Sequence, residues 1–252
     1  MAEKTVRIET PDGTTSTFIA TPDDGGPFPL VILYMDAPGI RDALRDMARR
    51  VAAEGYYTVL PDLYYRFGEG IWFDSAKLAP GSEEMTRMFA TMQQLTDDMV
   101  VSDTKAILEY VKSDALADDG PKGCVGFCMG GRHVLRVMAA LPDEFVAGSG
   151  LHPSFVVTEA SDSPHLGCQK VRGELYLGYG EIDEVAPPST IPALRQELDR
   201  HGVRVEFDVY PAADHGFMFP GHRYQEEAAE QCWERTLELF RRNLQGATVG
   251  AR

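Results

Sequence analysis

The sequence predicts an α/β protein with a mostly parallel central sheet, helices on both faces of that sheet and a β-hairpin at the N-terminus. Apolar, strand-like segments alternate with helix-like segments along most of the 252 residues, which is typical of parallel βαβ units. Residues 29–35, PLVILYM, are continuously apolar, as expected for a strand that is buried on both faces. These observations favour one sheet between two layers of helices.

The first half of the chain supplies the hairpin and two core strands. Residues 5–10 and 14–21 are rich in β-forming residues and flank a Pro-Asp-Gly turn, which predicts the hairpin. Apolar residues at i, i+3, i+4 and i+7 from Leu44 predict the first helix. The other predicted elements are strands at 29–35 and 56–60, a loop at 67–80 and helical stretches at 83–95 and 97–112.

The second half continues the alternation. Its predicted elements are a strand at 122–127, a helix from there to about 141, strands at 145–151 and 174–177, a helix at 190–201, a strand at 203–210 and a closing helix at 223–244. No linker-like stretch is long enough to separate two domains, so we expect a single domain over residues 1–252. Residues 246–252 are expected to be a flexible tail.

The charge of the chain narrows the classes of partner. The chain has 24 Lys and Arg against 39 Asp and Glu, a formal net charge of −15, which argues against nucleic acid and anionic membrane surfaces. No apolar run reaches the roughly 18 residues of a membrane span, and the N-terminus lacks the apolar stretch of a signal peptide. We therefore expect a cytoplasmic protein that acts on a small molecule. The sequence is silent on its oligomeric state.

The four cysteines do not form a metal-binding pattern. They contain no CxxC, and no His/Cys pair follows at zinc-finger spacing, so we expect neither a metal nor another cofactor. In a reducing cytoplasm they are expected to be free thiols. Cys124, Cys168 and Cys232 lie in no catalytic motif and are best interpreted as core residues.

Cys128 stands out from the other three. Residues 126–130 read Gly-Phe-Cys-Met-Gly at a predicted strand-to-helix junction, which is the spacing of a nucleophile elbow with cysteine in place of serine. Such a turn lifts the side chain above the sheet and places the sulfur at a helix N-terminus, where the dipole favours the thiolate. The N–H of Met129 is then a natural oxyanion donor. The competing interpretation is a buried structural cysteine.

The chain order nucleophile, acid, histidine selects the partners of Cys128. His215 follows the predicted strand 203–210 and precedes the final helical segment, so it is the predicted base. His152 follows the strand 145–151 and is a candidate for the pocket wall, but it precedes every plausible acid loop. Asp183 is the predicted acid because Ile182 and Val185 suggest a loop packed against the protein, with Glu181 as the alternative.

The loop after the first buried strand is expected to supply the second oxyanion donor. In the sequence Met-Asp-Ala-Pro-Gly, residues 35–39, the N–H of Ala37 is the best candidate because Pro38 has none. Asp36 then places a carboxylate at the mouth of the site, or caps the helix that follows.

Together these residues resemble the dienelactone hydrolase family of α/β-hydrolases over nearly the whole chain. Residues 55–64, GYYTVLPDLY, are similar to a second motif of that family, and residues 126–131, GFCMGG, are similar to its nucleophile elbow. Residues 180–187 and 213–217 resemble its acid and histidine loops. The resemblance implies an α/β-hydrolase fold and a catalytic triad of Cys128, Asp183 and His215.

The resemblance also identifies two departures from the family pattern. A family glutamate that contacts the resting thiol and shifts when substrate binds corresponds to Asp36, which is one methylene shorter. A family arginine that holds a substrate carboxylate lies four residues after the histidine, where this chain has Phe219. Arg87 and Arg223 are the candidates to replace it.

These inferences predict a cysteine-dependent hydrolase of small esters or lactones that works through a thioester. Because Phe219 replaces the arginine, we expect a substrate less anionic than a dienelactone. A thiol redox sensor or ligand-binding protein that keeps the elbow without turnover is the alternative from another class. Acyl transfer to an acceptor other than water is a third hypothesis.

Overall fold

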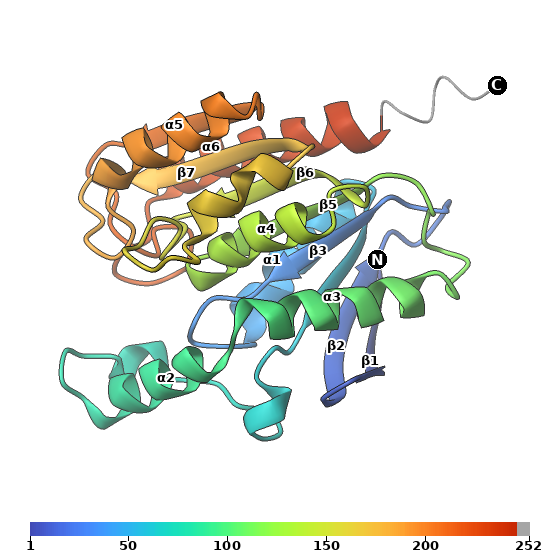
Figure 1. The fold of residues 1–252 in the computed structure, drawn as a ribbon. Coiled ribbons are helices and arrows are strands. Elements are labelled where there is room, and N and C mark those ends of the chain that lie inside the picture. Colours follow the sequence, from blue (N-terminus) through green and yellow to red (C-terminus); the bar gives the residue numbers. More distant parts are fainter. Residues whose placement is uncertain (246–252) are drawn as a thin grey trace.

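The computed structural model describes residues 1–245, which form one eight-stranded sheet flanked by helices (Figure 1). The predicted tail at 246–252 lies outside the described residues. The strand order is β1-β2-β4-β3-β5-β6-β7-β8, and all neighbours are parallel except β1 with β2 and β2 with β4. The strands are β1 (Ala2–Thr10), β2 (Gly13–Thr21), β3 (Leu30–Tyr34), β4 (Tyr57–Pro61), β5 (Lys122–Phe127), β6 (Phe145–Leu151), β7 (Glu174–Gly180) and β8 (Val205–Tyr210). The predicted fold, including the N-terminal hairpin, is confirmed.

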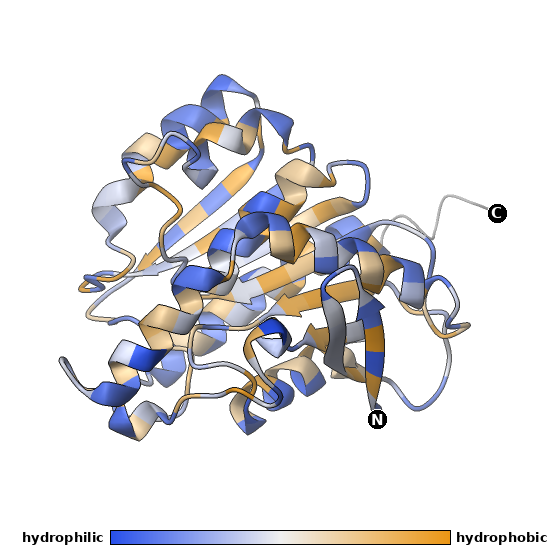
Figure 2. Ribbon diagram, turned by 60° about the horizontal axis from the view of Figure 1, so that its bottom comes forward, coloured by the Kyte–Doolittle hydropathy of each residue, from blue (hydrophilic) through white to orange (hydrophobic). Residues whose placement is uncertain are grey.

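Helices cover both faces of the sheet. They are α1 (Asp42–Ala53), α2 (Glu83–Gln94), α3 (Asp97–Val111), α4 (Met129–Ala140), α5 (Ile191–Arg200) and α6 (Glu226–Phe240). Helices α3, α4 and α5 lie on one face and α1 and α6 on the other, while α2 stands away from the sheet (Figure 1). Figure 2 shows mainly hydrophobic central strands, because both faces of these strands are covered. Within residues 1–245, no helix combines the length and the apolar character needed to cross a bilayer.

Several predicted boundaries differ from the structure. Strand β7 runs to Gly180 rather than ending at 177, although a Gly-Tyr-Gly sequence is typical of a loop. At both positions there is no room for a side chain. A Cβ at Gly178 would lie 2.8 Å from the sulfur of Cys232, and a Cβ at Gly180 would collide with the carbonyl of Ala213. The closing helix α6 begins at Glu226, three residues later than predicted.

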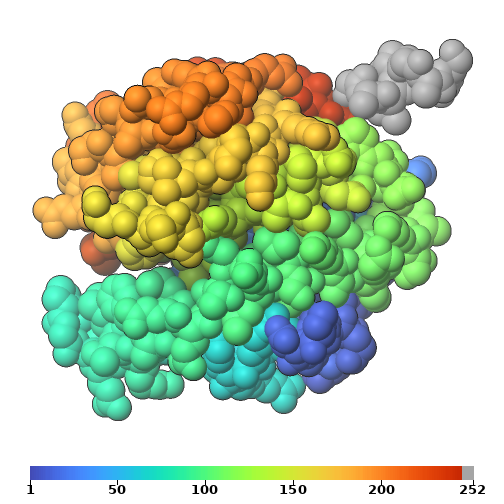
Figure 3. Space-filling view, in the orientation of Figure 1, coloured from blue at the N-terminus to red at the C-terminus, as the bar shows by residue number. Residues whose placement is uncertain are grey.

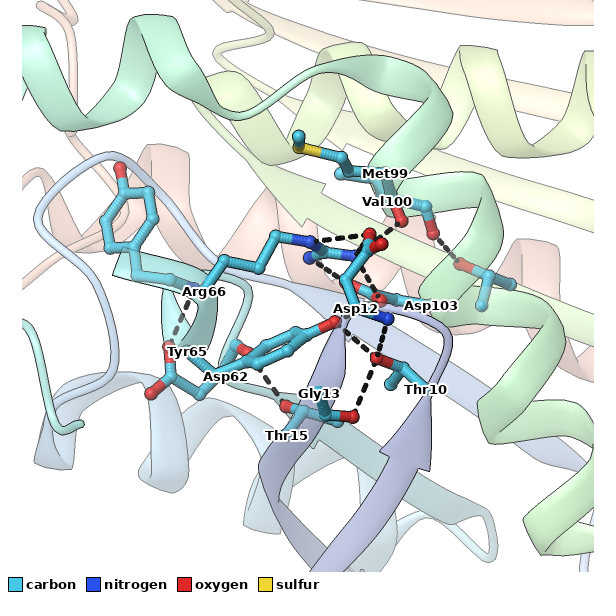
Figure 4. A network of polar contacts seen from close by, with 12 residues as sticks. Thr10, Asp12, Gly13, Thr15, Asp62, Tyr65, Arg66, Met99, Val100 and Asp103 are labelled. Carbon is cyan, nitrogen blue, oxygen red and sulfur yellow. Dashed lines mark hydrogen bonds and ion pairs between the residues drawn. The ribbon is translucent and has the colours of Figure 1, made fainter. Parts of the chain in front are cut away.

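A buried polar network fixes the chain that follows β4 (Figure 4). The guanidinium of Arg66 donates to Asp103 of α3 at 2.7 Å and to Asp12 of the hairpin turn at 2.8 Å. The hydroxyl of Tyr65 donates to Asp103 at 2.9 Å and is hydrogen-bonded to Thr10. Because one buried carboxylate receives donors from two consecutive residues, the segment after β4 is held firmly beside the sheet.

Candidate active site

The junction of β5 and α4 forms the predicted elbow around Cys128. Cys128 has φ 54° and ψ −117°, a strained conformation for a residue with a side chain, and its N–H donates to the carbonyl of Leu151 at 3.1 Å. A Cβ at Gly126 would collide with the carbonyl of Gly130, and a Cβ at Gly130 would collide with the end of β3. The glycines are therefore required by close approach of strand, turn and helix, as the motif predicts.

Ser154, which the sequence analysis did not single out, is the hydrogen-bonding neighbour of the thiol. Its Oγ lies 3.4 Å from the Sγ of Cys128, and its N–H donates to the carbonyl of Cys128 at 3.0 Å. Ser154 lies in the loop that follows β6, the strand beside β5. Its position at the carboxyl end of a neighbouring strand was the available signal.

His215 and Asp183 meet at the carboxyl ends of β8 and β7. The Nδ1 of His215 lies 2.8 Å from Oδ2 of Asp183, whose carboxylate is fully buried. The other oxygen of Asp183 accepts from the backbone N–H groups of Val185 at 2.8 Å and Ala186 at 2.7 Å. Glu181, the alternative acid, instead accepts from the N–H of Ala212 at 2.8 Å. The geometry favours Asp183 as the orienting acid.

The pKa values of Cys128 and His215 are shifted in opposite directions. Burial raises the pKa of the Cys128 thiol, but the charge and hydrogen bond of His215 together with Ser154 lower it more strongly, so the net shift is downward. Burial lowers the pKa of His215, but Cys128 and Asp183 outweigh it and raise this pKa to about 10. The two groups therefore favour a thiolate–imidazolium pair.

The two residues predicted to supply the oxyanion donors follow the carboxyl ends of β5 and β3. Met129 begins α4, so its N–H has no acceptor within the helix. Ala37 lies in the turn after β3, and its carbonyl accepts from the hydroxyl of Tyr64 at 2.8 Å. The same hydroxyl lies 3.6 Å from the Sδ of Met129, and Tyr64 is fully buried. Tyr64 thus touches both residues that are predicted to supply the oxyanion donors.

Asp36 is bound to an arginine that the sequence analysis missed. Its two carboxylate oxygens accept from Arg41 at 2.6 and 2.7 Å, and the Arg41 guanidinium lies 4.6 Å from the centre of the Phe219 ring. Phe219 packs against Phe127 and His152, with ring centres 5.3 and 5.9 Å apart. An arginine therefore does approach the position of Phe219, but from the opposite end of the sequence, which spacing alone does not reveal.

The two arginines that the sequence proposed are placed differently. Arg87 of α2 is exposed, pairs with Glu84 at 3.0 Å and lies over Phe73, with 5.7 Å to the ring centre. Arg223 donates to the carbonyl of His215 at 3.3 Å and pairs with Asp214 at 3.3 Å. Arg223 thus supports the histidine loop, whereas no contact ties Arg87 to the predicted triad.

His152 lies against His215 but has a different environment. The two ring centres are 4.8 Å apart at 76°, and neither ring nitrogen of His152 has a hydrogen-bond partner among residues 1–245. Burial, then the charges of His215 and Arg41, lower the pKa of His152 well below its usual value. A neutral, buried His152 fits the predicted pocket wall. Among the described residues, no three His, Cys, Asp or Glu side chains gather as a metal site.

A sheet with a cysteine elbow after β5, an acid after β7 and a histidine after β8 defines an α/β-hydrolase. Comparison with known proteins makes the assignment narrower. The model of the dienelactone hydrolase family matches residues 15–244, so the chain belongs to that family. The family and the enzyme class predicted from the sequence, an ester or lactone hydrolase, are confirmed.

Two bacterial proteins are among the curated relatives of the chain. The chain is 30% identical to a protein of Methylorubrum extorquens over 94% of this chain and 79% of that protein, and 28% identical to one of Synechocystis over 90% and 91%. Both are named putative carboxymethylenebutenolidase. A solved structure from Klebsiella pneumoniae, described as a putative dienelactone hydrolase, superimposes with a TM-score of 0.82 at 26% identity, covering 95% of this chain and 98% of that one.

Proposed function

We propose that the chain hydrolyses small esters or lactones through a thioester on Cys128, with His215 as acid and base and Asp183 as its orienter. The observation that carries the proposal is the 2.8 Å contact between His215 Nδ1 and a fully buried Asp183 carboxylate, in a site where His215 lowers the pKa of the Cys128 thiol. A structural cysteine needs neither partner.

In the first half of the reaction, the thiolate of Cys128 attacks the carbonyl carbon and forms the C–S bond. The carbonyl electrons move to oxygen, where the N–H groups of Met129 and Ala37 stabilise the negative charge. The tetrahedral intermediate then expels the alkoxide or enolate, which takes the proton of the His215 imidazolium. The products are a neutral His215 and a thioester on Cys128.

In the second half, neutral His215 removes a proton from water as that water attacks the thioester. The second tetrahedral intermediate expels the Cys128 thiolate, which restores the thiolate–imidazolium pair with His215. Asp183 keeps its charge throughout and stabilises the imidazolium. Because thiolate leaves more readily than an amine, esters and enol-lactones with good leaving groups suit this nucleophile better than amides do.

The surroundings of the site favour a substrate without charge. Arg41 is the guanidinium over Phe219, but both oxygens of Asp36 already bind it, so the pair adds no net charge. The rings of Phe127 and Phe219 provide an apolar wall, and the chain as a whole carries −15. The role of Asp36 proposed here is thus to occupy Arg41; a thiol-gating role remains a prediction.

A matched pair of lactones tests this proposal. We expect Cys128-dependent hydrolysis with a higher kcat/KM for a neutral enol-lactone or aryl ester than for a dienelactone carboxylate of similar size. A preference for the anion that high salt weakens would contradict the substrate assignment. Turnover that persists in Cys128→Ala would contradict the mechanism and support the alternative of a sensor or ligand-binding role for the elbow.

A further inference from the structure

A groove of about 1000 Å³ lies beside the elbow and shares Met129 with the site described above. One wall comes from α2 and the start of α3, and the other from α4 and the segment after β6. Figure 3 shows this hollow between the green surface of α2 and α3 and the yellow surface of residues 155–165. The residues that line it include Phe89, Met92, Met129, His133 and Phe155.

Two lining residues of the groove are direct chain neighbours of residues of the site. Met129, the predicted oxyanion donor, directly follows Cys128 in the chain and lines the groove. Phe155 directly follows Ser154, whose hydroxyl lies 3.4 Å from the sulfur of Cys128, and also lines it. Since adjacent Cα atoms are about 3.8 Å apart, the lining at Met129 and Phe155 lies close to Cys128 and Ser154.

Two exposed aromatic rings belong to the apolar lining of the groove. Phe89 on α2 and Phe155 on the opposite wall are each 40% exposed, which is unusual for phenylalanine. Phe155 has φ 57°, a left-handed conformation that bulky residues rarely adopt. Arg132 holds it there by donating to its carbonyl at 3.2 Å. The backbone is therefore held in a strained conformation that leaves this ring open to the groove.

The floor of the groove carries a buried histidine whose ring nitrogens make no hydrogen bond to residues 1–245. This residue, His133, is 3% exposed. Its Nδ1 lies 3.4 Å from Oδ1 of Asp97, and Arg132 already binds that carboxylate at 2.6 Å. A buried ring nitrogen without a partner is costly unless a ligand or water satisfies it.

We infer that this groove binds the acyl chain of an ester substrate, a medium-length alkyl or aryl chain that bears a hydroxyl or carbonyl group. The chain runs from the carbonyl at Cys128 past Phe155 and packs against Phe89 and Met92, and its polar group reaches His133. Cationic and acidic residues balance along the groove, three of each, so a polar but uncharged group fits best. This inference rests on the proposed function and extends its substrate class beyond small lactones.

A series of p-nitrophenyl esters with different acyl chains tests the groove. We expect kcat/KM to rise from acetate to octanoate, because each buried methylene favours binding about fourfold. Phe155→Ala and Phe89→Ala should each lower the octanoate-to-acetate ratio about tenfold. Leu116→Ala, which removes an equally exposed apolar side chain away from the groove, should leave the ratio unchanged. A flat wild-type series, or equal losses for every ester in the Phe155 variant, would overturn the inference.

The polar floor has its own test. An octanoate ester with a terminal hydroxyl should be hydrolysed better than plain octanoate by the wild type, and His133→Phe should remove that preference. Equal preference in both proteins would overturn the role of His133. Hydrolysis of any ester that survives Cys128→Ala would instead overturn the proposed function, so the two failures are distinguishable.

Discussion

The region of the site contains two cysteines and two histidines, and within each pair the two residues differ in their pKa or in their partners. Cys124 and Cys128 lie four residues apart on β5 and its turn, yet burial raises the pKa of Cys124 while His215 lowers that of Cys128. His152 and His215 are in contact, yet only His215 has an acid partner. The pKa of each residue is therefore set by its surroundings rather than by its chemical type, and the charges of its neighbours decide the direction of the shift.

The largest expected effect on activity is the difference between replacing Cys128 and replacing Cys124. Cys128→Ala should lower kcat by about 10⁴-fold or more because it removes the proposed nucleophile. Cys124→Ala should keep the activity and lose about 1 kcal/mol of stability, because it removes only buried sulfur. Steady-state hydrolysis and thermal denaturation of both variants check this. Equal loss of activity in two folded variants would refute the assignment of Cys128.

The second largest expected effect on activity is the difference between replacing His215 and replacing His152. His215→Ala should lower kcat by about 10³- to 10⁴-fold, and Asp183→Asn should be nearly as damaging because it disturbs the tautomer of His215. His152→Ala and Glu181→Gln should each cost less than about tenfold, because neither group orients the base. Single-turnover rates report the chemical step directly. The ranking is wrong when the His152 variant is as slow as the His215 variant.

The consecutive residues Tyr64 and Tyr65 allow a similar comparison for the predicted oxyanion hole. Tyr64→Phe should lower kcat about ten- to a hundredfold with little change in KM, because the turn at Ala37 loses its hydrogen bond. Tyr65→Phe removes a part-buried hydroxyl from the network around Asp103 and should affect stability alone. Parallel losses of kcat in the two variants would show that Tyr64 has no special role.

The smallest expected effect is a change of specificity. Asp36→Asn should free Arg41 and raise kcat/KM for an anionic lactone relative to a neutral one, by up to about tenfold. Asp42→Asn removes the same charge from an exposed pair with Arg45 and is the matched control. If both variants shift the ratio equally, general charge rather than the Asp36 pair is responsible.

Parts of the site that are consecutive in the sequence could be predicted better than parts that come together only in the fold. The elbow is visible because strand, glycines and helix are consecutive, and the order of Cys128, Asp183 and His215 follows the order of the strands. Arg41 was missed because its approach to Phe219 depends on packing between the two ends of the chain. Ser154 was missed for a similar reason, since it meets Cys128 only when β6 pairs with β5.

The same limit applies to backbone geometry. The strand β7 extends through two glycines that spacing alone assigns to a loop, because only the packed structure shows what a Cβ would meet there. The exposed ring of Phe155 depends on a left-handed backbone that no propensity predicts for phenylalanine. Features that depend on steric space or on backbone strain can therefore be recognised only once the fold is known.

The pH dependence of the reaction follows from the paired shifts. Because the pKa of Cys128 is lowered, the thiolate forms at a pH below its ordinary value of 9.0, and kcat/KM should rise as pH increases through that lowered value. Because the pKa of His215 is raised to about 10, the imidazolium that protonates the leaving group is lost above that pH. The activity should therefore fall on the alkaline side near pH 10.

Alkylation of Cys128 by iodoacetamide, measured by peptide mass spectrometry across a pH series, tests the thiolate–imidazolium pair most directly. In the wild type we expect a midpoint below 9.0, and activity lost in proportion to the modification of Cys128. In His215→Ala the midpoint should move upward, because the charge that stabilises the thiolate is gone. A midpoint at or above 9.0 that is the same in both proteins, or full modification with activity retained, would contradict the account.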